Sequence, residues 1–167
     1  MTYSRLAACA GALGVFLSAA VGVSAVTEEQ PEAISKSIRK QMDQQFAEWA
    51  VVGAPACAGA SNPAVADIDF DQSPDVAMVV RTDGGESHVV IAMPRVLGGA
   101  IVHNLGPLSA IPGATHLVVL PQGRVVSEAG AMLVDYLSGP TFAAASCEGP
   151  LVAFVWTGYG FRRVTVA

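Results

Sequence analysis

The chain has 167 residues, of which 52% are hydrophobic and 14% are charged, and its formal net charge is −5 at pH 7. This length is enough for one domain with its own hydrophobic core. The acidic balance and the lack of a basic stripe argue against nucleic acid or an anionic membrane surface as a partner.

Residues 1–25 have the pattern of a signal peptide. Arg5 precedes a long apolar stretch, and Val23-Ser24-Ala25 supplies the small residues of a cleavage site. Two alternatives remain, because the apolar stretch is also about long enough to span a bilayer, and because Leu6-Ala7-Ala8-Cys9 looks like a lipoprotein acylation box. The signal peptide predicts a periplasmic or secreted protein, with residues 26–167 as a single domain and no stable membrane insertion after cleavage.

One segment has a helical period, and it predicts a helix over about residues 31–50. Its apolar residues recur every three or four positions: Ile34, Ile38, Met42, Phe46 and Trp49. Pro31 suits the first turn, and Gly53-Ala54-Pro55 should end the helix. We expect the apolar face to cover a sheet, although such a face could also serve a partner.

An acidic loop at residues 67–75 follows, with carboxylates at its first, third, fifth and ninth positions. These groups repel one another unless a cation intervenes, and Ca²⁺ takes six to eight oxygens at about 2.3–2.6 Å. The loop is not an EF-hand, because position 12 is Met78. The expected calcium ligands are the side chains of Asp67, Asp69, Asp71 and Asp75 and the backbone carbonyl of Ser73. The alternative is a solvated acidic turn without metal.

Short Val-rich runs separated by turn residues fill the rest of the chain. They predict strands at 76–81, 88–93, 116–120, 124–127, 132–137, 151–157 and 161–166, with a possible strand at 100–103. Asp83-Gly84-Gly85, Pro121-Gln122-Gly123 and Gly158-Tyr159-Gly160 read as hairpin turns. The predicted fold class is therefore α+β, an N-terminal helix packed on an antiparallel, mostly sequential β-meander over residues 76–167.

Two cysteines, Cys57 and Cys147, remain after signal cleavage, and an exported chain has one way to pair them. Such a disulfide would close a loop of about 90 residues and would stabilise the fold by roughly 4 kcal/mol in the chain-entropy model. The alternative is two independent buried thiols. Neither cysteine has a histidine nearby in the sequence to favour a thiolate.

Other candidate chemistry has weaker support. The three histidines, His88, His103 and His116, form no local ligand pair for zinc. The motifs of common hydrolases are absent from the sequence, although a triad assembled in space stays open. Trp156, Tyr159 and Phe161 form either a ligand-binding patch or cross-strand packing.

The run from Asp67 to Val80, Asp-Ile-Asp-Phe-Asp-Gln-Ser-Pro-Asp-Val-Ala-Met-Val-Val, resembles the FG-GAP/VCBS-type repeat. This calcium-loop hairpin is best known from integrin α-chain β-propellers, and its pattern is Asp-x-Asp/Asn-x-Asp-Gly-x-x-Asp followed by an apolar strand. The resemblance implies that the four aspartates ligate Ca²⁺. It occurs once, whereas a propeller needs several blades. The chain as a whole is similar to small exported bacterial proteins of unknown function that end in a Trp-x-Gly-x-Gly-Phe-Arg-Arg hairpin, here residues 156–163.

The sequence thus predicts an exported, non-catalytic binding or structural module with one calcium loop and one disulfide. Its partner would be an envelope or extracellular protein or polymer. The alternatives are an envelope-associated hydrolase that uses carboxylates of the same loop, and an inhibitor or accessory protein of an envelope enzyme.

Overall fold

The structure is a computed structural model that describes residues 32–123, 125–127, 134–149 and 151–166. The predicted signal peptide lies outside these residues. Within them the chain forms one α-helix, one 3₁₀ turn and eleven strands. The elements are α1 (Lys36–Gln45), β1 (Trp49–Val51), β2 (Ala64–Ala66), β3 (Asp75–Thr82), β4 (Ser87–Pro94), β5 (Ala100–Pro107), η1 (Leu108–Ala110), β6 (His116–Leu120), β7 (Val125–Ser127), β8 (Val134–Tyr136), β9 (Thr141–Ala145), β10 (Leu151–Trp156) and β11 (Phe161–Val166).

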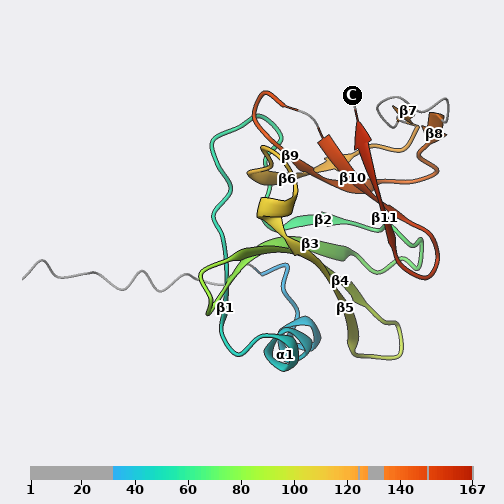
Figure 1. Ribbon diagram of the computed structural model, residues 1–167. Coiled ribbons are helices and arrows are strands. Elements are labelled where there is room, and N and C mark those ends of the chain that lie inside the picture. The colour runs from blue at the N-terminus through green and yellow to red at the C-terminus, as the bar shows by residue number, and fades with distance from the viewer. Residues whose placement is uncertain (1–31, 124, 128–133, 150, 167) are drawn as a thin grey trace, which may run out of the picture.

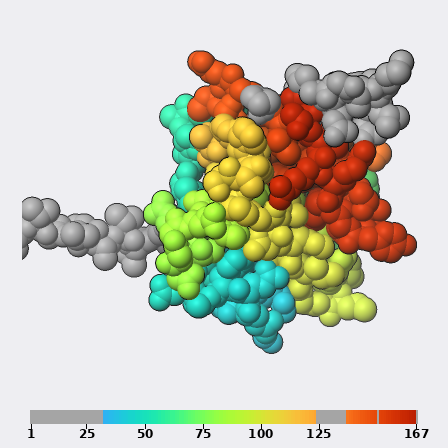
Figure 2. All heavy atoms as spheres, in the orientation of Figure 1, coloured from blue at the N-terminus to red at the C-terminus, as the bar shows by residue number. Residues whose placement is uncertain are grey.

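The strands form two antiparallel sheets and a small ribbon. The first sheet has the order β1-β3-β4-β5, with β2 also paired to β3, and the second has the order β11-β10-β9-β6. Strands β7 and β8 pair with each other. Figure 1 shows the first sheet in the middle, with α1 below it and the second sheet above it. The space-filling view shows the same order, from the helical segment in blue to the C-terminal strands in red (Figure 2).

The central strands β3 and β4 of the first sheet are buried on both faces, and this explains their sequence. On one face Ala77 and Ile91 pack against Phe142 and Phe154 of the second sheet. On the other face Val76, Met78, Val80, Val90 and Ala92 pack against Ile38 and Met42 of α1. A strand covered on both sides needs apolar residues at successive positions and not at alternate ones. The continuous run Val76-Ala77-Met78-Val79-Val80 is therefore what a middle layer requires.

The predicted α+β class, with a helix lying on one sequential meander, is wrong. The described chain is mostly β, with two packed sheets and a helix of ten residues in place of the predicted span 31–50. Ser35 caps the helix start by accepting a hydrogen bond from the Ile38 N–H at 3.3 Å. Phe46 is already extended, and Trp49 begins β1, where it pairs with Thr82. Pairing with the edge of β3 thus overrides the helical period beyond Gln45.

The division into two sheets also corrects the predicted strand pairing. Strand β6 was expected to form a hairpin with β7, but it pairs with β9. Sequence analysis missed β9 because three of its five residues are alanine, which is depleted in strands, and its complete burial between neighbouring strands supplies the stability instead. The hairpins β3–β4 and β10–β11, with turns at Asp83-Gly84-Gly85 and Gly158-Tyr159-Gly160, are confirmed.

Cys57 and Cys147 are joined, and their Cα atoms lie 5.5 Å apart, inside the usual range for a disulfide. The prediction that these two residues lie close enough to bond is confirmed. The bridge ties the segment between β1 and β2 to the end of β9. No helix among the described residues is long and apolar enough to cross a membrane.

Asn62 connects the same segment to the middle of the first sheet. Its side-chain amide donates hydrogen bonds to the backbone carbonyls of Val52 and Val79, the latter at 2.9 Å, and its Oδ1 accepts one from the Val79 N–H at 2.9 Å. One side chain thus contacts three backbone groups and reinforces the direct hydrogen bond from the Val52 N–H to the Val79 carbonyl, which is 2.9 Å long.

We predict that Asn62→Ala lowers the free energy of unfolding by about 2–4 kcal/mol, because the Val52 carbonyl and the Val79 N–H lose the hydrogen bonds that Asn62 makes, while the Val79 carbonyl keeps only the one from Val52. Urea unfolding measures this change. Gln122→Ala, at an exposed turn position, is the control and should change stability by less than about 0.5 kcal/mol. An Asn62→Ala protein as stable as the control would contradict this role.

Candidate metal centre

The acidic loop, residues 67–75, connects β2 to β3 and is held by its own carboxylates. Asp67 Oδ2 accepts a hydrogen bond from the Gln72 N–H at 3.1 Å, and Asp69 Oδ1 accepts one from the Asp71 N–H at 3.3 Å. Asp71 Oδ1 accepts one from the Ser73 N–H at 2.8 Å. Each carboxylate therefore fixes a turn of the backbone that follows it.

Two residues of the loop have left-handed backbone conformations that side chains rarely adopt. The φ angles are 62° at Phe70 and 68° at Gln72. Gln72 occupies the position at which the FG-GAP/VCBS pattern has glycine, which adopts this conformation without cost. The chain makes the same turn with a glutamine.

Three of the predicted ligands converge. Asp67, Asp69 and Asp71 are half-buried, and each has an oxygen within 4.8 Å of the others. Two oxygens bound to one Ca²⁺ can lie no more than about 5 Å apart, twice the Ca–O distance. The three carboxylates therefore fit a shared hard cation, and they repel one another without it.

Of the other two predicted ligands, Asp75 does not join this group, and the Ser73 carbonyl stays a prediction. Asp75, the first residue of β3, is fully buried, and its Oδ2 accepts a hydrogen bond from the Ile68 N–H at 2.9 Å. Its second oxygen, Oδ1, has no hydrogen-bond partner. Ser73 donates its N–H to Asp71. Asp75 thus closes the loop from inside the fold.

The electrostatics of Asp75 follow from its position. Burial raises the pKa of its carboxyl from 3.8 to about 7, and the hydrogen bond from Ile68 opposes this change. Repulsion from Asp69, Asp71 and Asp67, in this order, raises the pKa further. A charge on Asp75 is therefore costly, chiefly because the carboxyl is buried and further because its three neighbours are acidic.

Arg95 brings one positive charge to the loop, which sequence analysis did not anticipate. It follows β4, and its guanidinium lies 3.3 Å from Asp69 Oδ2. This ion pair links the loop to the β4–β5 connection and balances one carboxylate, while Asp67 and Asp71 keep their negative charge at the same point.

Phe70 attaches the loop to the second sheet. Its side chain is 59% exposed, yet the ring tip reaches Gly139 so closely that a Cβ there would lie 2.1 Å from Phe70 Cζ. A small cavity of about 100 Å³ lies beside this contact, lined by Ile68, Phe70, Gly139, Trp156 and Arg162 among others. The acidic loop thus forms one wall of a hollow whose other wall is the second sheet.

Three rings pack together nearby, where β5 meets the β10–β11 hairpin. His103 lies 5.7 Å from Trp156 and 5.2 Å from Phe161 between ring centroids, and the two aromatic rings are 5.0 Å apart. Desolvation lowers the pKa of His103, and Arg95 lowers it further. Trp156 and Phe161 form a cross-strand pair, whereas Tyr159 is exposed at the turn tip.

The other two histidines lie elsewhere. His88 lies 3.4 Å from Glu86 and contacts Asn104. His116 lies beside the Cys57–Cys147 disulfide, so the fold supplies the neighbouring histidine that the local sequence lacks. It could not be anticipated, because β6 meets the two cysteines only through long-range pairing.

Comparison with known proteins adds no further constraint: no family model matches the chain, and neither a curated protein nor a solved structure matches it.

We predict a pH dependence of stability that belongs to Asp75. The pKa of Asp75 is raised in the folded state. Its contribution to the free energy of unfolding is therefore most favourable below about pH 4 and is lost as the pH rises through about 7. In chelator, the free energy of unfolding of the wild type should fall between pH 5 and pH 8 relative to Asp75→Asn, on the order of 2–4 kcal/mol. The variant keeps an oxygen for the Ile68 N–H but cannot ionise. Urea unfolding at both pH values tests this, and parallel profiles would contradict it.

Proposed function

We propose that the protein is an exported binding or structural module whose acidic loop binds one Ca²⁺ through Asp67, Asp69 and Asp71. The observation that carries this proposal is the convergence of three carboxylates within 4.8 Å beside a fully buried fourth, Asp75, that has an unpartnered oxygen. Arg95 balances Asp69, and the other carboxylates oppose the stability of the fold unless a cation compensates them.

The ligand atoms favour calcium over softer metals. All of them are carboxylate oxygens, which suit hard cations such as Ca²⁺ and Mg²⁺. Calcium accepts irregular shells completed by water, whereas Mg²⁺ demands a near-ideal octahedron. The resemblance to the FG-GAP/VCBS loop supports the same ion. Affinity should be modest, on the order of 10⁻⁴–10⁻³ M, as in extracellular modules.

The bound ion would fix the surface around the loop. Asp69 is tied to Arg95, and Phe70 contacts Gly139, so a rigid loop holds the first sheet against the second. The hollow lined by Phe70 and Trp156 lies on this junction. We infer that this surface meets the partner, an envelope or extracellular protein or polymer, and that calcium sets its shape.

Calcium should raise the melting temperature of the wild type. With about 5 mM Ca²⁺ and the affinity above, binding adds about 1–2 kcal/mol to the free energy of unfolding, which corresponds to a rise of about 2–8 °C. Asp71→Asn removes one charge from the converging group and should lose most of this rise. Thermal unfolding with Ca²⁺ and with chelator measures both.

Asp83→Asn is the matched control, because Asp83 is exposed at the β3–β4 turn and accepts a hydrogen bond from the Gly84 N–H. It should keep the full calcium effect. Equal wild-type melting temperatures in Ca²⁺ and chelator would mean that the loop is a solvated acidic turn. If Asp71→Asn and Asp83→Asn lost the calcium-dependent rise in melting temperature equally, the effect would not come from the acidic loop.

A further inference from the structure

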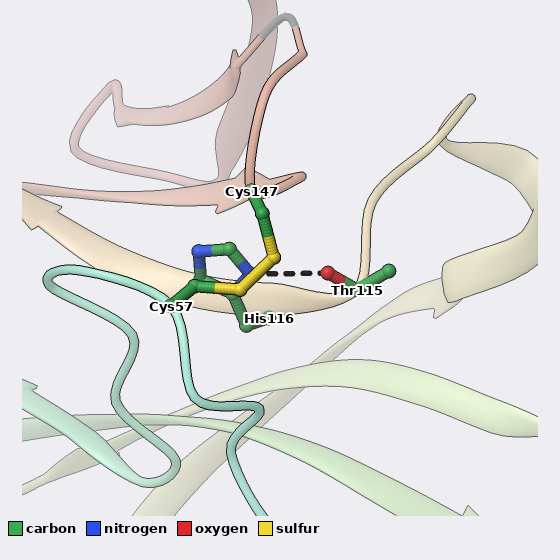
Figure 3. Close-up of a disulfide and its surroundings, with 4 residues drawn as sticks. All are labelled: Cys57, Thr115, His116 and Cys147. Carbon is green, nitrogen blue, oxygen red and sulfur yellow. Dashed lines mark hydrogen bonds between the residues drawn. A yellow bond between two sulfur atoms is a disulfide. The ribbon is translucent and has the colours of Figure 1, made fainter.

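A second group of potential metal ligands differs from the acidic loop in its chemistry, because it offers sulfur and nitrogen atoms in place of oxygen. Cys57, His116 and Cys147 each have a ligand atom within 4.8 Å of the others. Figure 3 shows the imidazole of His116 directly beside the two sulfur atoms, with the Thr115 hydroxyl next to the ring. His116 is 3% exposed, Cys57 is half-buried and Cys147 is exposed. The group thus has a buried side and a side open to solvent.

Backbone pairing holds these three residues together independently of the disulfide. His116 pairs with Ala145 in the second sheet, and Cys147 lies two residues further along. The Thr115 N–H donates to the Ala145 carbonyl at 2.7 Å, and the Ser61 N–H donates to the Leu117 carbonyl at 3.0 Å. The Ala60 N–H in turn donates to the Cys57 carbonyl at 3.1 Å. These contacts hold the segments that carry the two cysteines beside His116, so we expect the cysteines to stay close to it after reduction.

We propose that reduction of the Cys57–Cys147 disulfide converts it into a zinc site completed by His116. Two thiolates and one imidazole are preferred zinc ligands, with bond lengths of about 2.3 Å to sulfur and 2.0–2.1 Å to nitrogen. A tetrahedral ion with these bonds separates its ligand atoms by about 3.5–3.8 Å. The sulfurs need to move from about 2 Å apart to this distance, which side-chain rotation provides with Cα atoms 5.5 Å apart.

The conversion balances in two steps. A dithiol reductant gives two electrons and two protons to the disulfide, so the S–S bond breaks, two cysteine thiols form, and the reductant becomes a disulfide. Zn²⁺ then binds both sulfurs and a ring nitrogen of His116, and the two thiols release their protons. The exposed Cys147 gives the reductant access, since exchange requires attack on a reachable sulfur.

The charge and surroundings suit a divalent ion. Two thiolates neutralise Zn²⁺, so the bound group carries no net charge against the buried His116. The Thr115 hydroxyl lies 3.1 Å from His116 Nδ1 and orients the ring, as hydrogen-bond partners of metal-binding histidines do. The exposed side leaves room for water as a fourth ligand. Carboxylates dominate the other site, so hard and soft cations would bind at different places.

The test is a zinc titration of the oxidised and the phosphine-reduced protein without oxygen, with excess Ca²⁺ to occupy carboxylates. Co²⁺ serves as the spectroscopic probe, because its thiolate charge-transfer band reports sulfur ligation. We expect the reduced chain to bind one Co²⁺, which Zn²⁺ displaces. The oxidised chain should show no thiolate charge-transfer band. His116→Asn should weaken zinc binding by at least about 10-fold. His88→Asn, a histidine away from the bridge, should bind like the wild type.

Equal zinc affinities of reduced wild type and His116→Asn would overturn the proposal. Loss of the fold on reduction would give the same result, because an unfolded chain would bind zinc through its thiols alone, without His116. The double variant Cys57→Ser/Cys147→Ser should show no cobalt–thiolate band, and its circular dichroism reports whether the backbone pairing persists without the bridge. A band in this variant, or none in the reduced wild type, would equally contradict a site built from these residues.

Discussion

The Asp75 side chain is fully buried where the acidic loop enters β3, and most of the local structure depends on how its charge is accommodated. One oxygen holds the Ile68 N–H, which closes the loop into a ring of eight residues. The other has no partner. Burial, and after it the repulsion of three further carboxylates, raises the pKa of Asp75 to about 7, so its charge is costly at neutral pH unless the group is protonated or a cation lies nearby. In our proposal, calcium provides this compensation while Asp75 stays charged.

The acidic loop has contacts with each of the strands or strand ends around it. Asp75 begins the central strand of the first sheet, Asp69 pairs with Arg95 after β4, and Phe70 contacts Gly139 ahead of β9. The disulfide connects the two sheets at a separate place. A cation at the loop would therefore act on the junction between the sheets, while the redox state of the cysteines acts on the region around His116. Two chemically distinct sites would thus act on different parts of one fold, whose three layers are the helix and the two sheets.

The sequence predicts features that depend on neighbours along the chain, and it fails where distant segments decide. The hairpin at Asp83-Gly84-Gly85 follows from local turn chemistry, and the cysteine pairing follows from the count. The helical period continues to Trp49 and predicts a helix that includes it, whereas pairing with Thr82 places this residue in a strand. The Ala-rich strand β9 has no local signal, so the second sheet was not separated from the first. In the site, the spacing of the aspartates predicts their convergence, but the ion pair with Arg95 and the inward turn of Asp75 arise from tertiary packing.

The most direct test is a carbon-detected NMR titration of the Asp75 carboxyl with and without calcium. Without calcium its pKa should be about 7, because burial and three negative neighbours favour the protonated form. A cation on Asp67, Asp69 and Asp71 offsets that repulsion, so saturating Ca²⁺ should lower the pKa of Asp75, whereas the effect of burial remains. A pKa near 7 that does not change with calcium would contradict the claim that the ion compensates this loop.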